Sequence, residues 1–112
     1  MFAVIWEYDV PARHEGAFAA LYGSQGEWVA LFRGFDGYVG TELLRDSHEP
    51  VANEAATHDQ ARLIRFVTID RWTSHAAYEA FLTAAESRYA HIDALGDTLT
   101  FAERCLGRFS VQ

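Results

Sequence analysis

Two histidines are the residues of this chain best suited to accept a proton, because imidazole titrates near neutral pH. His75 follows Thr73-Ser74, a pair typical of a helix N-cap, and so falls in the first turn of a predicted helix. Tyr78 lies one turn further on, and helical geometry therefore lets His75 and Tyr78 face one cavity. His91 lies at the end of the same helix and points away from its apolar stripe. For each histidine the alternative is an exposed side chain with no chemical role.

Aromatic side chains predict a site for a flat apolar ligand beside these histidines. Those expected to form it are Tyr22, Trp28, Trp72, Tyr78 and Phe81. Between a sheet and its helices, such residues make walls with a few polar tips, which suit a small aromatic molecule. The alternative is that they only fill the core. A cavity of about 300 Å³ or more that touches either histidine would favour a ligand site, and a filled one a structural role.

Hydrophobic periodicity predicts the elements that position these residues. Strand-like runs of β-branched and aromatic residues alternate with segments whose apolar residues recur at helical spacing. The predicted elements are strand 2–10, helix 12–33, strand 36–45, strand 62–72, helix 74–90 and strand 98–109, with Gly96 in the last connection. This β-α-β-β-α-β order is the ferredoxin-like α+β pattern, a four-stranded antiparallel sheet with two helical segments. At this length we expect a single domain, 1–112.

Two segments depart from ideal patterning. Tyr22-Gly-Ser-Gln-Gly26 places two glycines inside the first helix, so we expect a kink or break there. The glycines provide either a packing notch or an opening beside a pocket. Residues 46–61 have no clear period and are predicted to be a flexible loop. Potential metal ligands in this loop lack any recognised spacing and predict no metal site; they are His48, Glu49, His58 and Asp59.

Composition excludes several classes of partner and cofactor. The net charge of −7 makes nucleic acid and anionic membranes poor partners. No phosphate-binding glycine loop or flavin motif is present in the sequence, and no cofactor is predicted. Cys105 is the single cysteine, expected to be a small buried residue, so no disulfide within the chain can form. The first residues lack the features of a signal peptide, and we expect a cytoplasmic protein that spans no membrane.

Apolar residues occupy both faces of the predicted sheet. In the first strand Phe2, Val4, Trp6 and Tyr8 share one face, and Ala3 and Ile5 share the other. Two helices cover only one face, so the other needs a second cover. A homodimer that packs sheet against sheet is the simplest arrangement. Glu7 falls on the dimer-facing side, where we expect a structural ion pair with Arg65 of the neighbouring strand rather than a catalytic carboxylate.

The chain resembles the antibiotic biosynthesis monooxygenase family of the dimeric α/β-barrel superfamily. The resemblance rests on the order of elements and on Gly34-Phe-Asp-Gly-Tyr38, Thr68-Ile-Asp-Arg-Trp-Thr-Ser74 and the Tyr78…Phe81 helix, and it covers nearly the whole chain. It implies a dimeric barrel and, in some members, cofactor-free oxidation of polycyclic phenols. It also places Trp6 on the helix-facing side of the sheet, and strand alternation then adds Val4 and Tyr8 to the expected pocket.

The haem-degrading branch of this family is disfavoured. That branch has an asparagine in the first strand, a tryptophan in the second helix and a histidine after an alanine near that helix's end. Ala90-His91 matches the histidine, but the other two positions fall on Trp6 and Phe81. The bulky indole of Trp6 would occupy part of the haem space.

Three functions therefore remain open. The first is a cofactor-independent monooxygenase acting on a polycyclic or phenolic compound. The second is a non-catalytic module that binds a small aromatic ligand. The third is an oxygen-independent lyase or cyclase of the same superfamily.

Overall fold

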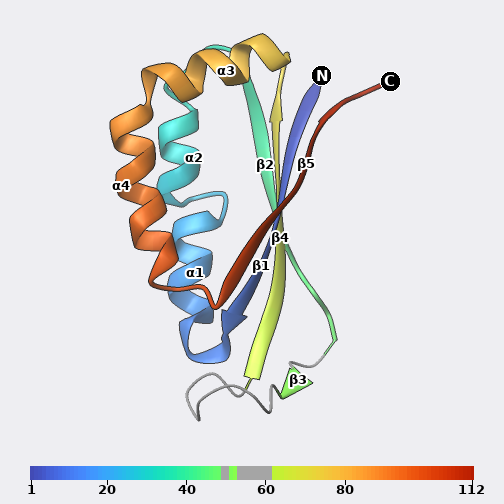
Figure 1. The fold of residues 1–112 in the computed structure, drawn as a ribbon, viewed down its shortest axis with the longest axis vertical. Helices are drawn as coiled ribbons and strands as arrows, with labels where there is room; N and C mark the ends of the chain where they lie inside the picture. Colours follow the sequence, from blue (N-terminus) through green and yellow to red (C-terminus); the bar gives the residue numbers. More distant parts are fainter. Residues whose placement is uncertain (49–50, 53–61) are drawn as a thin grey trace.

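The computed structural model describes residues 1–48, 51–52 and 62–112. Its strands are β1 (Phe2–Pro11), β2 (Tyr38–Arg45), β3 (Val51–Ala52), β4 (Arg62–Trp72) and β5 (Ala102–Ser110), and its α-helices are α1 (Glu15–Tyr22), α2 (Glu27–Phe32), α3 (His75–Ala84) and α4 (Glu86–Asp97). The long strands form an antiparallel sheet in the order β2-β4-β1-β5, and β3 pairs with β4. The helices lie on one side of this sheet (Figure 1). The predicted ferredoxin-like α+β fold is confirmed.

The first predicted helix is split, as its two glycines indicate. α1 ends at Tyr22 and α2 begins at Glu27. A Cβ at Gly23 would lie 2.6 Å from the Ala19 carbonyl oxygen, and one at Gly26 would lie 2.3 Å from that of Leu21. The glycines therefore allow a close approach of backbone to backbone. Most of the loop predicted at 46–61 lies outside the described residues, including Glu49, His58 and Asp59.

The second predicted helix is also divided, which the sequence did not indicate. The Ser74 hydroxyl accepts a hydrogen bond from the backbone N–H of Ala77 at 3.0 Å, so the predicted N-cap is present. The helix breaks at Ala85, and α4 then runs beside α2 (Figure 1). It extends through Gly96, which was wrongly predicted to lie in a connection. None of the described helices is long and apolar enough to cross a membrane.

Gly37 joins two of the sequence motifs on which the family resemblance rests. Its φ of +89° is favourable only for glycine, and a Cβ there would lie 2.5 Å from the Cβ of Ala77 in α3. The carbonyl oxygen of Gly37 accepts a hydrogen bond from the N–H of Thr73 at 2.7 Å. The turn before β2 is thereby fixed against the junction of β4 and α3.

The core lies between the sheet and the helices. Alternate residues of the two central strands are buried on this side; they are Phe2, Val4, Tyr8 and Val10 of β1 and Ile64, Phe66, Thr68 and Trp72 of β4. This alternation matches the predicted face of β1. Burial follows from the strand period, because every second side chain points toward the helices.

Two expectations about residues of the sheet are wrong. Glu7 pairs with Arg104 of β5, not with Arg65, because the register places Glu7 opposite Arg104 and Val67. Arg65 instead pairs with Asp46, with 2.9 Å between Nη2 and Oδ2. Cys105 was expected to be buried but is exposed in the described chain.

Candidate functional site

A narrow cavity lies between the sheet and the helices. Its volume is about 40 Å³, and five of the expected aromatic residues line it: Trp6, Tyr8, Tyr22, Trp28 and Tyr78. Ring contacts hold these walls in place: the ring centroids of Tyr8 and Tyr22 are 4.9 Å apart, and those of Trp28 and Tyr89 are 4.8 Å apart. The volume is far below the roughly 300 Å³ of ordinary ligand pockets, and neither His75 nor His91 lines the cavity, so the criterion stated from the sequence favours a structural role for this packing. A polycyclic ligand can enter only if wall side chains move.

Trp72 and Phe81 were also expected to contact a ligand, but they are core residues. Trp72 has no exposed surface and Phe81 only 1% of its maximum, and neither is among the residues that line the cavity. Their rings pack together with 5.0 Å between centroids. They belong to the packed core next to the cavity and do not form its surface.

Both candidate histidines lie outside this cavity. His75 is exposed, its ring stacks on Phe2 at 4.7 Å, and its Nε2 lies 2.9 Å from Glu79 Oε1. Tyr78 contributes to the cavity wall, so the two side chains do not face one space as expected. His91 is also exposed and lines a separate surface groove of about 460 Å³ between α2 and α4. Neither histidine is placed to take a proton from a ligand between sheet and helices.

The cavity contains polar residues that the sequence analysis did not select. They are Thr41, Thr68, Asp70, Asp93 and Glu103, and Tyr89 joins the aromatic wall. Strand parity could have found Asp70, because it shares a face with Phe66, Thr68 and Trp72, all buried toward the helices. A carboxylate at that position is an exception to the apolar pattern, which makes it a candidate for chemistry.

Asp70 is held by a chain of hydroxyl groups from β2. Thr41 Oγ1 donates a hydrogen bond to Asp70 Oδ1 at 2.7 Å, and Tyr38 Oη lies 2.8 Å from the same Thr41 oxygen. Since the Thr41 proton points to Asp70, Tyr38 must donate to Thr41. Burial raises the pKa of Asp70 to about 6, against a smaller opposing effect of the Thr41 hydrogen bond. A carboxyl group of this pKa exchanges protons close to neutral pH.

The tyrosines around the cavity stay neutral. Burial is the main cause that raises the pKa of Tyr8, Tyr22 and Tyr89 above the ordinary value of 10.0. Their hydroxyl groups therefore serve as hydrogen-bonding tips on the cavity walls, not as proton acceptors at neutral pH.

One wall residue has a hydrogen-bond donor without an acceptor. The indole N–H of Trp28 is buried and forms no hydrogen bond of acceptable geometry with the described residues. It lies near the hydroxyl of Tyr22 and lowers the pKa of that group against the larger effect of burial. An unmade hydrogen bond in a buried wall is costly.

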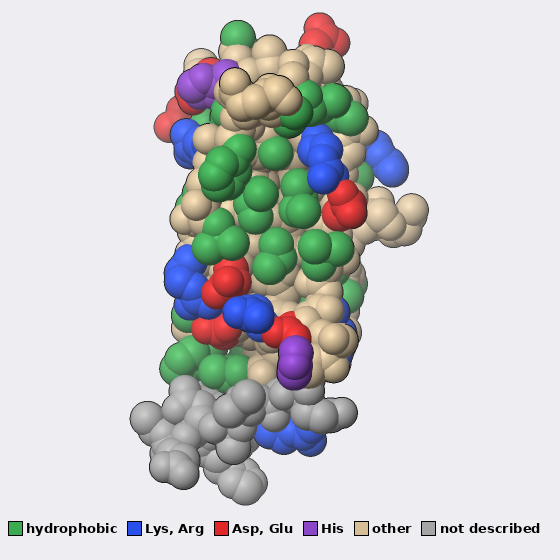
Figure 2. Space-filling model, turned by 90° about the vertical axis from the view of Figure 1, so that its right-hand side faces the viewer, with side chains coloured by type: hydrophobic (Ala, Val, Ile, Leu, Met, Phe, Trp, Pro, Cys, Tyr) green, Lys and Arg blue, Asp and Glu red, His purple; other side chains and the backbone are tan. Residues whose placement is uncertain are grey.

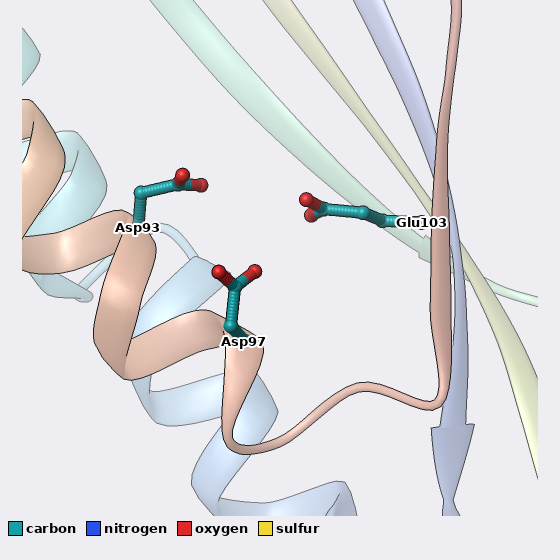
Figure 3. A group of neighbouring side chains, drawn as sticks. All are labelled: Asp93, Asp97 and Glu103. Atoms are coloured by element: carbon teal, nitrogen blue, oxygen red, sulfur yellow. The ribbon is translucent and has the colours of Figure 1, made fainter.

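Three carboxylates gather at one side of the cavity. Asp93 and Asp97 project from α4 toward Glu103 of β5 (Figure 3), and each offers a ligand oxygen within 4.8 Å of the others. Burial, and then the neighbouring carboxylates, raise the pKa of Asp93 and of Glu103. Oxygen donors of this kind are those that Mg²⁺ and Ca²⁺ prefer. Sequence spacing does not reveal this cluster, since its members come from two elements and only Asp93 and Asp97 are one helical turn apart.

The fold is like that of the antibiotic biosynthesis monooxygenases, and between its sheet and its helices lies an aromatic cavity that contains one hydroxyl-bound carboxylate.

Comparisons with solved structures support this assignment of the fold. The chain is similar to SnoaB, a cofactor-independent oxygenase from Streptomyces nogalater, over 99% of its length and 91% of SnoaB, with 21% identity and a TM-score of 0.57. A variant of SnoaB matches with 21% identity and a TM-score of 0.60, covering 92% of that chain. PA3566 from Pseudomonas aeruginosa matches with 17% identity and a TM-score of 0.60, over 99% of this chain and 93% of that one. No family model matches the sequence, and no curated protein matches it.

Proposed function

We propose that this protein is a cofactor-independent monooxygenase that oxidises a phenolic, polycyclic compound bound between its sheet and its helices. The observation that carries the proposal is the aromatic cavity, whose wall contains the unsatisfied N–H of Trp28. Its aromatic walls suit a flat ring system, and the N–H offers a hydrogen bond to a ring oxygen. The likeness of the fold to SnoaB, a cofactor-independent oxygenase, adds support.

The chemistry needs little from the protein. An electron-rich phenol or enol that has lost a proton can pass electrons to O₂ itself, so the protein binds the ring, removes the proton and excludes water. With anthrone, the methylene carbon loses two hydrogens and becomes a ketone. One atom of O₂ enters that ketone, and the other leaves as water. The substrate supplies the electrons, and no cofactor is required.

Oxygen uptake with anthrone tests the proposal. We expect one O₂ consumed per anthraquinone formed, at a rate well above that of the uncatalysed reaction. Trp28→Phe keeps the aromatic wall but removes the N–H, and should raise KM about tenfold, the loss of one hydrogen bond worth about 1.4 kcal/mol. Trp72→Phe is the matched control, because its N–H also has no acceptor among the described residues but Trp72 does not line the cavity.

The other outcomes identify the alternative functions. Product formed under strict anaerobiosis would indicate a lyase or cyclase. Tight binding of the aromatic compound without turnover would indicate a binding module, and equal kinetics for the two tryptophan variants would contradict the role of Trp28.

The proposed active form is a homodimer that packs sheet against sheet. Hydrophobic side chains gather over the middle of the sheet face that the helices leave open (Figure 2). Leu44 and Phe109 are nearly half exposed, and the register places both on the face of Glu7, away from the helices. Apolar patches of this kind mark surfaces that bind another protein. A second copy presents the same patch and closes a symmetric interface.

A further inference from the structure

Asp70 lies at the centre of the sheet and faces the cavity. It is in β4, and the register places it between Val4 of β1 and Thr41 of β2. Its Oδ1 accepts the Thr41 hydroxyl, whereas no described residue donates a hydrogen bond to Oδ2. No described Lys, Arg or His forms an ion pair with it. One oxygen is therefore fixed by the protein, and the other is left for a group that enters the cavity.

The titratable groups around Asp70 are acids and phenols. From the elements packed around the cavity they are Tyr8 of β1, Tyr38 of β2, Tyr78 of α3, Tyr89 and Asp93 of α4, Tyr22 of α1 and Glu103 of β5. Two cations act on tyrosines of this region: Arg108 lies over the Tyr78 ring at 5.2 Å, and Arg33 lowers the pKa of Tyr38. With no counter-ion beside it, an ionised Asp70 is best satisfied by a ligand that donates a hydrogen bond.

The geometry points to Asp70 as the group that takes the proton of an acidic hydroxyl on the bound aromatic ligand. This assignment rests on the proposed function and deepens it. The ligand O–H bond breaks, a new O–H bond forms on the free oxygen of Asp70, and the electron pair stays on the ligand oxygen as a phenolate. No electron leaves the ligand in this step. Oxidation by O₂, the co-reactant of the proposed function, follows from the phenolate.

Thr41 is a positioning residue for this step. Its hydroxyl fixes the orientation of the carboxylate, and its hydrogen bond opposes the rise in pKa that burial causes. At neutral pH Asp70 is therefore mostly ionised and able to accept a proton, yet more basic than an exposed aspartate. Loss of the Thr41 hydroxyl should move the ionisation of Asp70 to higher pH.

Binding of 2-naphthol tests the assignment without any turnover. This phenol stays neutral from pH 5 to 8, and its affinity should rise about tenfold across that range with a midpoint near pH 6, because a hydrogen bond to an ionised carboxylate is stronger than one to a carboxylic acid. Asp70→Asn should remove this pH dependence, and Thr41→Val should shift the midpoint upward. Asp93→Asn and Glu103→Gln should keep the midpoint, which separates Asp70 from the other acids of the cavity. 2-Methoxynaphthalene, which has no hydroxyl proton, should bind with no pH dependence.

Each alternative result is decisive. No binding of 2-naphthol, an unchanged pH profile in Asp70→Asn, or the same profile with 2-methoxynaphthalene would overturn the assignment. If 2-naphthol binds as expected but anthrone consumes no O₂, the proposed oxygenase function fails and the assignment of Asp70 stands. If anthrone, whose enol form carries the acidic hydroxyl, is oxidised and Asp70→Asn keeps the wild-type rate and pH profile, the function stands and the assignment fails.

Discussion

An ionised Asp70 lowers the free energy of unfolding at neutral pH. Its pKa of about 6 in the folded chain exceeds the ordinary value of 3.8, so between these pH values the folded state binds more protons than the unfolded state. The free energy of unfolding therefore falls as the pH rises from about 4 to about 6 and stays low above it. A buried acid that weakens the fold is characteristic of a functional position, because packing alone would favour an apolar residue.

Asp70→Asn should therefore stabilise the protein at pH 8 and not at pH 4. The amide is never charged and still accepts the Thr41 hydrogen bond, so we expect a gain of about 1–3 kcal/mol at pH 8 in urea unfolding. Asp36→Asn at an exposed turn is the matched control and should change the free energy of unfolding by less than about 0.5 kcal/mol. A loss of stability at pH 8 in Asp70→Asn would show that the buried, ionised carboxylate does not destabilise the fold.

Sequence patterns predicted the aromatic part of the site better than its polar part. Five expected aromatic residues line the cavity: Trp6, Tyr8, Tyr22, Trp28 and Tyr78. The family resemblance placed Trp6 on the helix-facing side, strand alternation then added Tyr8, and the helical period gave Tyr22 and Tyr78. The choice of His75 and His91 followed residue type, since imidazole has a suitable pKa, together with the helical spacing of His75 and Tyr78 and the match of His91 to a family position. Which helical face meets the sheet depends on tertiary packing, and the period alone does not give it.

Of the two helix breaks, one was predictable from the sequence and the other was not. The break after Tyr22 was predictable, because glycine is unfavourable in a helix and its absence of Cβ permits the close backbone contacts found there. The break at Ala85 was not, because alanine is the best helix former. Ala85 is only 1% exposed, so packing of this corner against the core, not local preference, sets the bend.

Gly96 shows how an element shapes the site. It lies inside α4, where glycine is otherwise unfavourable, and a Cβ there would lie 2.2 Å from the hydroxyl oxygen of Tyr22. Gly96→Ala should therefore destabilise the protein by about 1–3 kcal/mol, because Tyr22 has to move out of a packed wall. Thermal unfolding checks this prediction.

The control for Gly96→Ala is Gly16→Ala. Gly16 lies in α1 with no atom within 4 Å of the added Cβ, so its replacement should stabilise the helix by up to about 1 kcal/mol. If both variants are stabilised alike, the close approach of Gly96 and Tyr22 does not limit which residue is tolerated at position 96.

At the scale of the whole molecule, the helices cover one face of the sheet and leave the other face open (Figure 1). Apolar residues on both faces of β1 were visible in the sequence, and the helices do cover only one of them (Figure 1). The details of the open face were not predictable, because the Glu7–Arg104 pair depends on the register of β5. A register is set by the packing of the whole sheet.

Sedimentation equilibrium at micromolar concentration tests the proposed dimer. We expect a mass of twice the chain, and Val67→Glu should shift the protein to monomer, because Val67 lies at the centre of the open sheet face and an unpaired charge there would be buried in the interface. Leu95→Glu is the matched control, since Leu95 is 41% exposed on α4, on the helical side, and should leave the dimer intact. A wild-type monomer, or equal dissociation by both variants, would mean that the open sheet face does not bind a second copy.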